Sequence, residues 1–153
     1  MNFYDKFYKE FFRRYDNFDD LSLSWRTDKI KIAEVIEKLL HSNSNVLSYG
    51  CGIGFIEKFI VEKRSDLKLD CFDFSDIASR GLKRDLGHIC FTSDHNSLKK
   101  YDYIFMVGLM YALNDSDAIT LLKNIKKFLK EGGKIIISNT SIKARENDKN
   151  IKS

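Results

Sequence analysis

The most informative stretch of this chain is VLSYGCGIGF (46–55), in which a short apolar run meets three closely spaced glycines. We interpret residues 46–50 as a buried strand that ends in a glycine turn, and residues 55–64 as the helix that follows. Glycine allows a sharp turn and lets a ligand lie against the backbone, because no Cβ stands in the way. The first turn of a helix adds free N–H groups and a partial positive charge. This turn is therefore the first candidate binding site.

An acidic residue ends the strand that we expect next. The run LKLDCFD ends at Asp73, about 20 residues after the glycines. A carboxylate at that point can accept hydrogen bonds from both hydroxyls of a ribose, and it would repel a 2′-phosphate. A tight turn followed by a helix-capping aspartate would give the same residues, so a purely structural interpretation stays open.

Strand-like and helix-like segments alternate along the rest of the chain. Several strand-like runs are apolar on both faces, which is typical of a parallel sheet covered by helices. We therefore predict an α/β fold, with an open, mainly parallel sheet of about five strands in three layers. The further strands are expected at 88–92, 101–108 and 134–139, and the further helices at 75–84 and 118–129, the last ended by Gly132 and Gly133.

Two helices are expected before the sheet. The second has apolar residues at helical spacing over 30–40, with Thr27 or Asp28 as its cap. The first has an aromatic face, which is too large to leave in water, so we expect it to pack as a lid on its own domain, on a second copy in a homodimer, or on lipid. We set the boundaries at 1–24 for the lid, 25–140 for the sheet domain and 141–153 for a polar tail. The aromatic residues of the first helix are Phe3, Tyr4, Phe7, Tyr8, Phe11, Phe12 and Tyr15.

Composition excludes several classes of protein. The 153 residues suffice for one domain, and a net charge of +4 remains from 26 basic and 22 acidic residues. Basic residues cluster only in pairs, so we expect no nucleic-acid partner. No apolar run reaches the ~20 residues of a membrane span, and acids near the start argue against a secretory signal. The odd, widely spaced Cys51, Cys71 and Cys90 favour reduced thiols of a cytoplasmic protein over disulfides or a metal site.

Taken together, these motifs resemble the class I S-adenosylmethionine-dependent methyltransferases over about residues 25–140. VLSYGCGIG is similar to that family's cofactor loop, often V-L-D-x-G-C-G-x-G, and LDCFDFS to its second strand with a ribose-binding acid. SDHNS lies where the family often has an acid near the adenine amino group, and YDYIFMVGLMYAL is similar to the fourth strand and the loop that faces the acceptor. LLKNIKKFLKEGGKIIIS resembles the helix, glycine turn and fifth strand, with Glu131 in place of the usual proline.

The resemblance implies a Rossmann-like fold, S-adenosyl-L-methionine as cofactor, and transfer of its methyl group to an acceptor. It implies no metal, and no catalytic dyad is required, because the sulfonium is already activated and the protein chiefly aligns the acceptor. Tyr111, where such enzymes face the acceptor, and His95 are candidates for handling a proton. The residues that the resemblance places at the cofactor are Ser48, Gly50, Cys51, Gly52, Gly54, Asp73, Phe74, Asp94, His95 and Gly108.

Two departures from the family pattern bear on function. Ser48 stands where the family often has an acid that helps to hold the methionine amino group, which predicts weaker cofactor binding. The family's fold usually continues beyond the fifth strand, whereas 13 residues follow Thr140 here, so we expect this chain to be a fragment of a longer protein. Both departures keep an alternative open, a non-catalytic scaffold or partner-binding module of the same fold.

Other cofactors and acceptors fit the motifs less well. A nicotinamide-binding fingerprint requires a glycine where Phe55 stands, and the phosphate-binding Lys-Ser/Thr spacing is absent from the sequence. The chain contains no proline, so it has neither the Asn/Asp-Pro-Pro-aromatic signature of amino-group methylation nor a Pro-Cys nucleophile. By elimination we predict a small-molecule or glycan acceptor.

Overall fold

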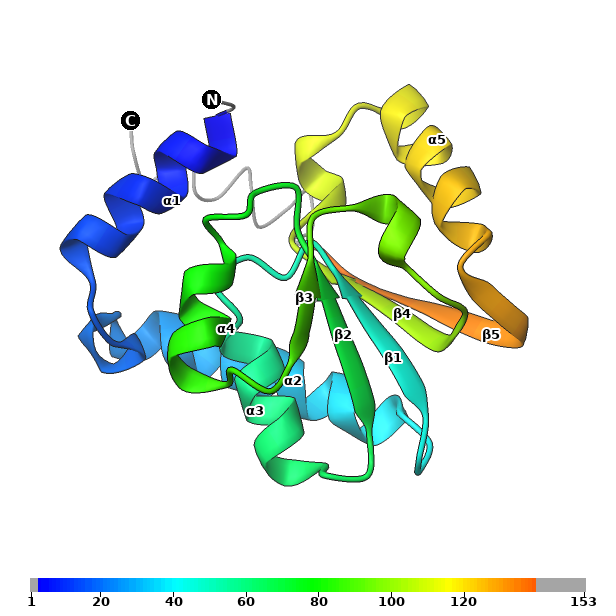
Figure 1. Ribbon diagram of the computed structural model, residues 1–153, viewed down its shortest axis with the longest axis horizontal. Coiled ribbons are helices and arrows are strands. Elements are labelled where there is room, and N and C mark those ends of the chain that lie inside the picture. Colours follow the sequence, from blue (N-terminus) through cyan, green and yellow to red (C-terminus); the bar gives the residue numbers. More distant parts are fainter. Residues whose placement is uncertain (1–2, 140–153) are drawn as a thin grey trace.

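The computed structural model describes residues 3–139 and shows a five-stranded parallel sheet between two layers of helices (Figure 1). The strands lie in the order β3-β2-β1-β4-β5, and every neighbouring pair is parallel. This arrangement confirms the predicted open, three-layer α/β fold. The strands are β1 (Asn45–Tyr49), β2 (Lys68–Phe72), β3 (Cys90–Thr92), β4 (Tyr101–Val107) and β5 (Leu129–Ser138).

Three helices, α2, α3 and α4, cover one face of the sheet, and α5 covers the other (Figure 1). Helix α1 lies beyond the edge where β1, β2 and β3 end (Figure 1). Its position places an aromatic helix close to the candidate site. The helices are α1 (Phe3–Arg14), α2 (Leu23–Leu39), α3 (Phe55–Lys63), α4 (Ser79–Asp85) and α5 (Asp115–Lys126), with one-turn 3-10 helices η1 (Phe18–Asp20), η2 (His95–Ser97) and η3 (Met110–Ala112).

The two faces of the sheet bury separate cores, because successive side chains of a strand point to opposite faces. On β1, Val46 packs with the layer of α2, α3 and α4, whereas Leu47 packs with α5. The same alternation on β4 sends Phe105 to the first core and Ile104 to the second. Ser48 therefore belongs to the face that α3 covers.

Helix α2 begins earlier than its apolar spacing predicts. Its first residue is Leu23, and the Ser22 hydroxyl caps it by accepting the N–H of Trp25 at 3.2 Å. The predicted caps, Thr27 and Asp28, lie inside the helix, so that prediction is wrong. Serine at an N-cap satisfies one of the free N–H groups of the first turn, and this local bond decides the start.

Helix α4 begins later than predicted, at Ser79. The residues before it form a turn in which Ala78 N–H donates to the carbonyl of Ser75 at 3.1 Å. Ser75 N–H in turn donates to the Asp73 carboxylate, at 3.0 Å. This carboxylate holds the chain in a turn where the helical spacing alone predicts a helix.

The end of α5 also differs from the prediction, because the helix stops at Lys126 and not at Gly132 and Gly133. The Tyr101 N–H donates to the carbonyl of Phe128 at 2.8 Å, so pairing with β4 already begins there. The two glycines lie within β5, where the register jumps from Tyr101–Leu129 to Tyr103–Lys134. They accommodate a bulge in the edge strand, and Gly132 has a left-handed φ of 72°.

The structure bears on two features used to predict the compartment, the lack of a membrane span and the state of the cysteines. Within residues 3–139, no helix is both long and apolar enough to cross a membrane. The three cysteines are unpaired thiols, of which Cys51 and Cys71 are buried and Cys90 is exposed. The predicted polar tail, 141–153, lies outside the described residues.

Candidate functional site

The glycine loop, residues 50–54, connects the end of β1 to the start of α3. Gly50, Gly52 and Gly54 have φ angles of 80°, 57° and 82°, in the left-handed region that other residues enter only with strain. The N–H groups of Gly50 and Cys51 both donate to the carbonyl of Phe72, at 2.7 and 3.1 Å. These bonds tie the loop to the end of β2 and leave it at the carboxyl edge of the sheet.

Asp73 lies at that same edge, directly after β2, as the sequence predicts. One carboxylate oxygen accepts the N–H of Gly52 at 2.9 Å and the other accepts the N–H of Ser75 at 3.0 Å. The residue is 6% exposed, and burial raises the pKa of its carboxyl above the usual range. Each oxygen keeps a second lone pair for a ligand. The same carboxylate therefore shapes the loop and presents acceptors beside it.

Ser48 meets a partner that the sequence did not reveal. Its hydroxyl donates to Glu57 Oε1 at 2.5 Å, and both residues are buried, with exposed fractions of 2% and 3%. Burial raises the pKa of Glu57 to about 7, although the hydrogen bond from Ser48 opposes that rise. Glu57 precedes the fully buried Ile60 by three positions on α3, so both residues lie on the inner face of the helix. An acid at this spacing from apolar residues is the feature of the sequence that could have identified Glu57.

Helix α1 brings a second unforeseen residue, Tyr8, onto the glycine loop. A Cβ placed on Gly52 would lie 3.0 Å from the Tyr8 hydroxyl oxygen, so this hydroxyl sits directly on the loop. Burial, together with the nearby carboxyl of Asp73, raises the pKa of the Tyr8 phenol. Asp5, one turn earlier, accepts a hydrogen bond from the Ser75 hydroxyl at 2.6 Å. The aromatic helix is thus latched over the loop and the turn after β2.

Phe74 and His95 come together at the ends of β2 and β3. Their ring centroids are 5.7 Å apart, and both rings contact Phe72 and Tyr49. Phe74 keeps 49% of its surface exposed. The His95 Nε2 atom lies 2.6 Å from the Tyr49 hydroxyl, and burial lowers the pKa of the imidazole. A partly open aromatic surface results.

Asp94 is exposed next to this aromatic surface. It caps the one-turn helix η2, because its Oδ1 atom accepts the N–H of Asn96 at 2.9 Å. The other predicted residues lie after β4. Gly108 has a left-handed φ of 64°, and its N–H donates to the carbonyl of Ser138 at 2.9 Å. Tyr111 follows in η3.

The loop after β4 meets the glycine loop at Leu109, whose side chain would be 3.3 Å from a Cβ on Gly50. The structure therefore gathers the predicted residues along one edge of the sheet. Cys51 forms part of the loop and has a buried thiol. In residues 3–139, no group of three or more His, Cys, Asp or Glu side chains is arranged to hold a metal ion.

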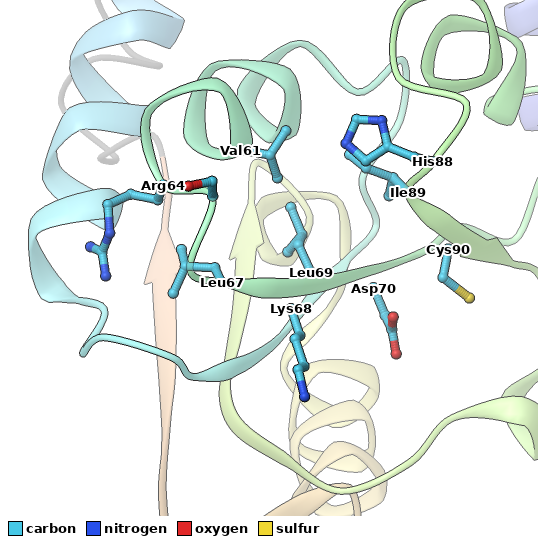
Figure 2. Close-up of a pocket in the computed structure, with 10 residues that line it drawn as sticks. Val61, Arg64, Leu67, Lys68, Leu69, Asp70, His88, Ile89 and Cys90 are labelled. Carbon is cyan, nitrogen blue, oxygen red and sulfur yellow. The ribbon is translucent and has the colours of Figure 1, made fainter.

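A cavity of about 350 Å³ lies elsewhere, at the amino ends of β2 and β3 (Figure 2). Lys68 opens β2 and Cys90 opens β3, so this cavity lies at the opposite edge of the parallel sheet from the glycine loop. Figure 2 shows the side chains of Lys68, Asp70 and Cys90 on one side of the strands and those of Val61 and His88 on the other. They do not converge on a common point, so the cavity is not the candidate site.

Comparison with known proteins assigns a family to this geometry. Residues 24–151 match a family model described as a methyltransferase domain. The chain belongs to this methyltransferase family. The assignment confirms the resemblance that the motifs indicate, and it covers the five strands together with the glycine loop.

Individual relatives of this methyltransferase domain are remote in sequence. Scoulerine-9-O-methyltransferase 3 from Papaver somniferum is 30% identical over 95 residues, which make up 61% of this chain and 26% of that protein. The methyltransferase domain thus spans about a quarter of the length of this curated relative.

Solved structures agree with the Rossmann-like fold of the methyltransferase domain. Coclaurine N-methyltransferase, bound to N-methylheliamine and S-adenosylhomocysteine, has a TM-score of 0.61 and 18% identity over 71% of this chain and 35% of that one. A TehB-like S-adenosylmethionine-dependent methyltransferase from Corynebacterium glutamicum has a TM-score of 0.60 and 20% identity, over 78% and 70% of the two chains. At such identities the likeness concerns the fold alone.

Proposed function

We propose that this methyltransferase domain binds S-adenosyl-L-methionine on the glycine loop and transfers its methyl group to an acceptor. The observation that carries the proposal is the loop itself: three left-handed glycines, tied by Gly52 N–H to the buried carboxylate of Asp73. Ligands of open α/β sheets bind outside the carboxyl ends of the strands, where this loop lies. The S-adenosylhomocysteine bound by coclaurine N-methyltransferase supports the same choice of cofactor.

Each element at this edge has a proposed part in holding the cofactor. The left-handed φ angles of Gly50, Gly52 and Gly54 bend the loop so that its backbone can face the methionine portion of the cofactor. Asp73 accepts hydrogen bonds from the ribose hydroxyls with the lone pairs that its two backbone bonds leave free. The exposed ring of Phe74 offers a surface on which adenine can stack.

The remaining residues border the adenine and methyl ends of the proposed site. Asp94 accepts a hydrogen bond from the adenine amino group. His95 packs beside the adenine, and its Nε2 atom is already hydrogen-bonded to the Tyr49 hydroxyl. Gly108 leaves room for the cofactor at the end of β4. When bound, the sulfonium supplies an activated methyl group. Tyr111 is our candidate for orienting the acceptor, because it follows β4 in the loop that meets the glycine loop.

We propose a small-molecule or glycan acceptor. Relatives named for scoulerine and coclaurine support the small-molecule class. Adjacent basic residues cluster only in pairs along the sequence, so we do not propose a nucleic-acid acceptor. We also propose a cytoplasmic location, supported by the unpaired thiols of Cys51 and Cys71 in the core.

Helix α1 is proposed to act as a lid on the cofactor. Tyr8 rests on Gly52, and Asp5 bonds to Ser75, so α1 must shift when a ligand occupies the loop. The outer face of the same helix still exposes Phe3 and Phe7, at 74% and 51%. Pairing of that face with a second copy in a homodimer is the alternative.

A non-catalytic module is the second candidate function. The Tyr8 hydroxyl fills the space against Gly52 that a cofactor would need, which favours a domain whose site stays closed. Binding of S-adenosylhomocysteine separates the two functions, because a closed module would not bind it.

Replacement of Asp73 by alanine tests the proposed site. We expect Asp73→Ala to weaken binding of S-adenosylhomocysteine by about 1.5–3 kcal/mol, since hydrogen bonds to a charged group are lost. Isothermal titration calorimetry measures the change. The variant also loses the bonds to Gly52 and Ser75, so Asp73→Asn, which keeps one acceptor oxygen, serves as the milder variant.

The matched control is Asp85→Ala, which removes an exposed carboxylate at the end of α4. Circular dichroism confirms that each variant is folded. An unchanged dissociation constant in folded Asp73→Ala would contradict the proposed ribose contact.

A further inference from the structure

Glu57 is a buried acid that the proposed binding scheme leaves without a role. It lies in the first turn of α3, directly under the glycine loop, and its side chain reaches the Ser48 hydroxyl on β1. A carboxylate of this kind is costly to bury unless hydrogen bonds and positive charge compensate. Ser48 supplies the hydrogen bond. The compensating charge has to come from elsewhere.

The charged and titratable groups around Glu57 do not supply it in full. Lys29 on α2 favours the ionised carboxylate, whereas Asp73 and burial itself oppose ionisation. The remaining neighbours are two thiols and a phenol, which carry no positive charge. The groups that face Glu57 from each packed element are Tyr8 of α1, Lys29 of α2, Cys51 of the loop, Cys71 of β2 and Asp73.

As a result, Glu57 is poised to respond to a cation. Burial raises its pKa to about 7, so near neutral pH the carboxyl is partly protonated. A positive ligand charge on the loop would stabilise the carboxylate and lower that pKa, and a ligand that lacks the sulfonium charge would lower it less. By linkage, binding of the cation releases protons and becomes tighter as pH rises through the pKa.

The proposal that follows rests on the proposed function. We propose that Glu57, held by Ser48, makes the glycine loop prefer the cationic sulfonium S-adenosylmethionine over its neutral thioether product, S-adenosylhomocysteine. Asp73, which accepts the N–H of Gly52, adds negative charge next to the loop. Once the methyl group has left, the ligand no longer carries the sulfonium charge and Glu57 takes a proton from solvent. The same carboxyl thus favours entry of the substrate form and release of the product form.

Calorimetric titration of the 153-residue chain with each ligand at pH 6 and pH 8 tests the proposal. The quantity compared is the ratio of the two dissociation constants, product form over substrate form. We expect this ratio to rise between the two pH values by about three- to tenfold more in the wild type than in Glu57→Gln. The control Glu62→Gln removes an exposed acid of the same helix and should behave as the wild type.

Proton counting provides a measurement that needs no variant. Titrations in two buffers of different ionisation enthalpy give the protons released on binding. At pH 7 we expect the wild type to release more protons with S-adenosylmethionine than with S-adenosylhomocysteine, and Glu57→Gln to lose most of the difference. A role of Glu57 limited to holding Ser48 would not produce this signature.

These measurements distinguish failure of the Glu57 proposal from failure of the proposed function. If both ligands bind the wild type but their ratio changes with pH equally in Glu57→Gln, and proton release does not differ between them, the charge selection by Glu57 is overturned and the proposed function stands. If neither ligand binds the wild type at millimolar concentration, both are overturned.

Discussion

The carboxylates of Asp73 and Glu57 support the glycine loop from two directions. Asp73 accepts the N–H of Gly52 from the β2 side, while Glu57 accepts the hydroxyl of Ser48 from the α3 side. Burial raises the pKa of both carboxyls. One of these acids is bonded to the loop itself and the other to the strand before it, and burial makes the ionisation of both costly as long as no cation is bound.

The stability of the ligand-free chain should fall as pH rises because of Glu57. Its pKa is about 7 in the folded state, against 4.5 ordinarily, so between these values the folded chain holds a proton that the unfolded chain has lost. The contribution of Glu57 to the free energy of unfolding is therefore full below pH 4.5, and it is lost as the pH rises to about 7. We expect the free energy of unfolding to fall by about 2–3 kcal/mol more in the wild type than in Glu57→Gln between pH 4.5 and 7.5.

Urea unfolding at several pH values measures that difference. Glu62→Gln on the same helix is the control, and its profile should parallel the wild type. Parallel profiles for the wild type and Glu57→Gln would contradict a raised pKa at this position.

The packing of α4 against the glycine loop requires glycines for lack of space, and not only for their backbone angles. A Cβ on Gly81 would lie 2.1 Å from the carbonyl oxygen of Ile53, which belongs to the loop backbone. Gly54 is packed in the same way, since its Cβ would lie 2.4 Å from the side chain of Leu82. Helix and loop touch here without room for a methyl group, so α4 sets the position of the loop.

We expect Gly81→Ala to lower the free energy of unfolding by about 1–3 kcal/mol, because the methyl group forces α4 and the loop apart. Thermal and urea unfolding provide the measurement. The control is Gly87→Ala just after the same helix, where the added Cβ would meet the carbonyl oxygen of Lys83 at an ordinary 3.4 Å. Equal stability of the two variants would show that the loop can yield without cost.

Local patterns predicted most of the elements, but not all of their limits. The apolar runs located all five strands, and the signal is least interrupted in β1 and β4, which are largely buried on both faces. The helix at 118–129 ends earlier in the structure, since Leu129 pairs with Tyr101 of β4. Sequence spacing could not reveal this, because the competing partner lies nearly thirty residues away along the chain.

The residues of the candidate site also fall into those that local sequence predicts and those that only tertiary packing reveals. Asp73 and the glycines were predictable, because each occupies a strand end or a turn that local residues define. Glu57 was missed although its spacing from Ile60 indicated the inner face of α3, because its partner Ser48 lies on another element. Tyr8 is one of six aromatic residues on α1, and only tertiary packing selects the one that reaches Gly52.

Over the molecule as a whole, α1 links the chain's first residues to the carboxyl edge of the sheet (Figure 1). Tyr8 contacts the loop after β1, and Asp5 contacts the turn after β2. Further along, Arg84 of α4 donates to the carbonyl of Asp16 and lies over the ring of Phe18. A ligand that moves the loop would therefore also move α1, through the contact with Tyr8, and α4, through the close packing at Gly54 and Gly81.

Amide hydrogen exchange with and without S-adenosylhomocysteine tests the proposed cofactor site most directly. A bound ligand should slow exchange in residues 50–54 and 73–75, where it would lie against the backbone, and should change exchange in α1, because Tyr8 has to leave Gly52 to make room for it. Exchange in α5, on the other face of the sheet, is the internal control and should change least. At saturating ligand we expect protection of the glycine loop together with changed exchange in α1. Unchanged exchange in residues 50–54 at millimolar ligand would contradict it.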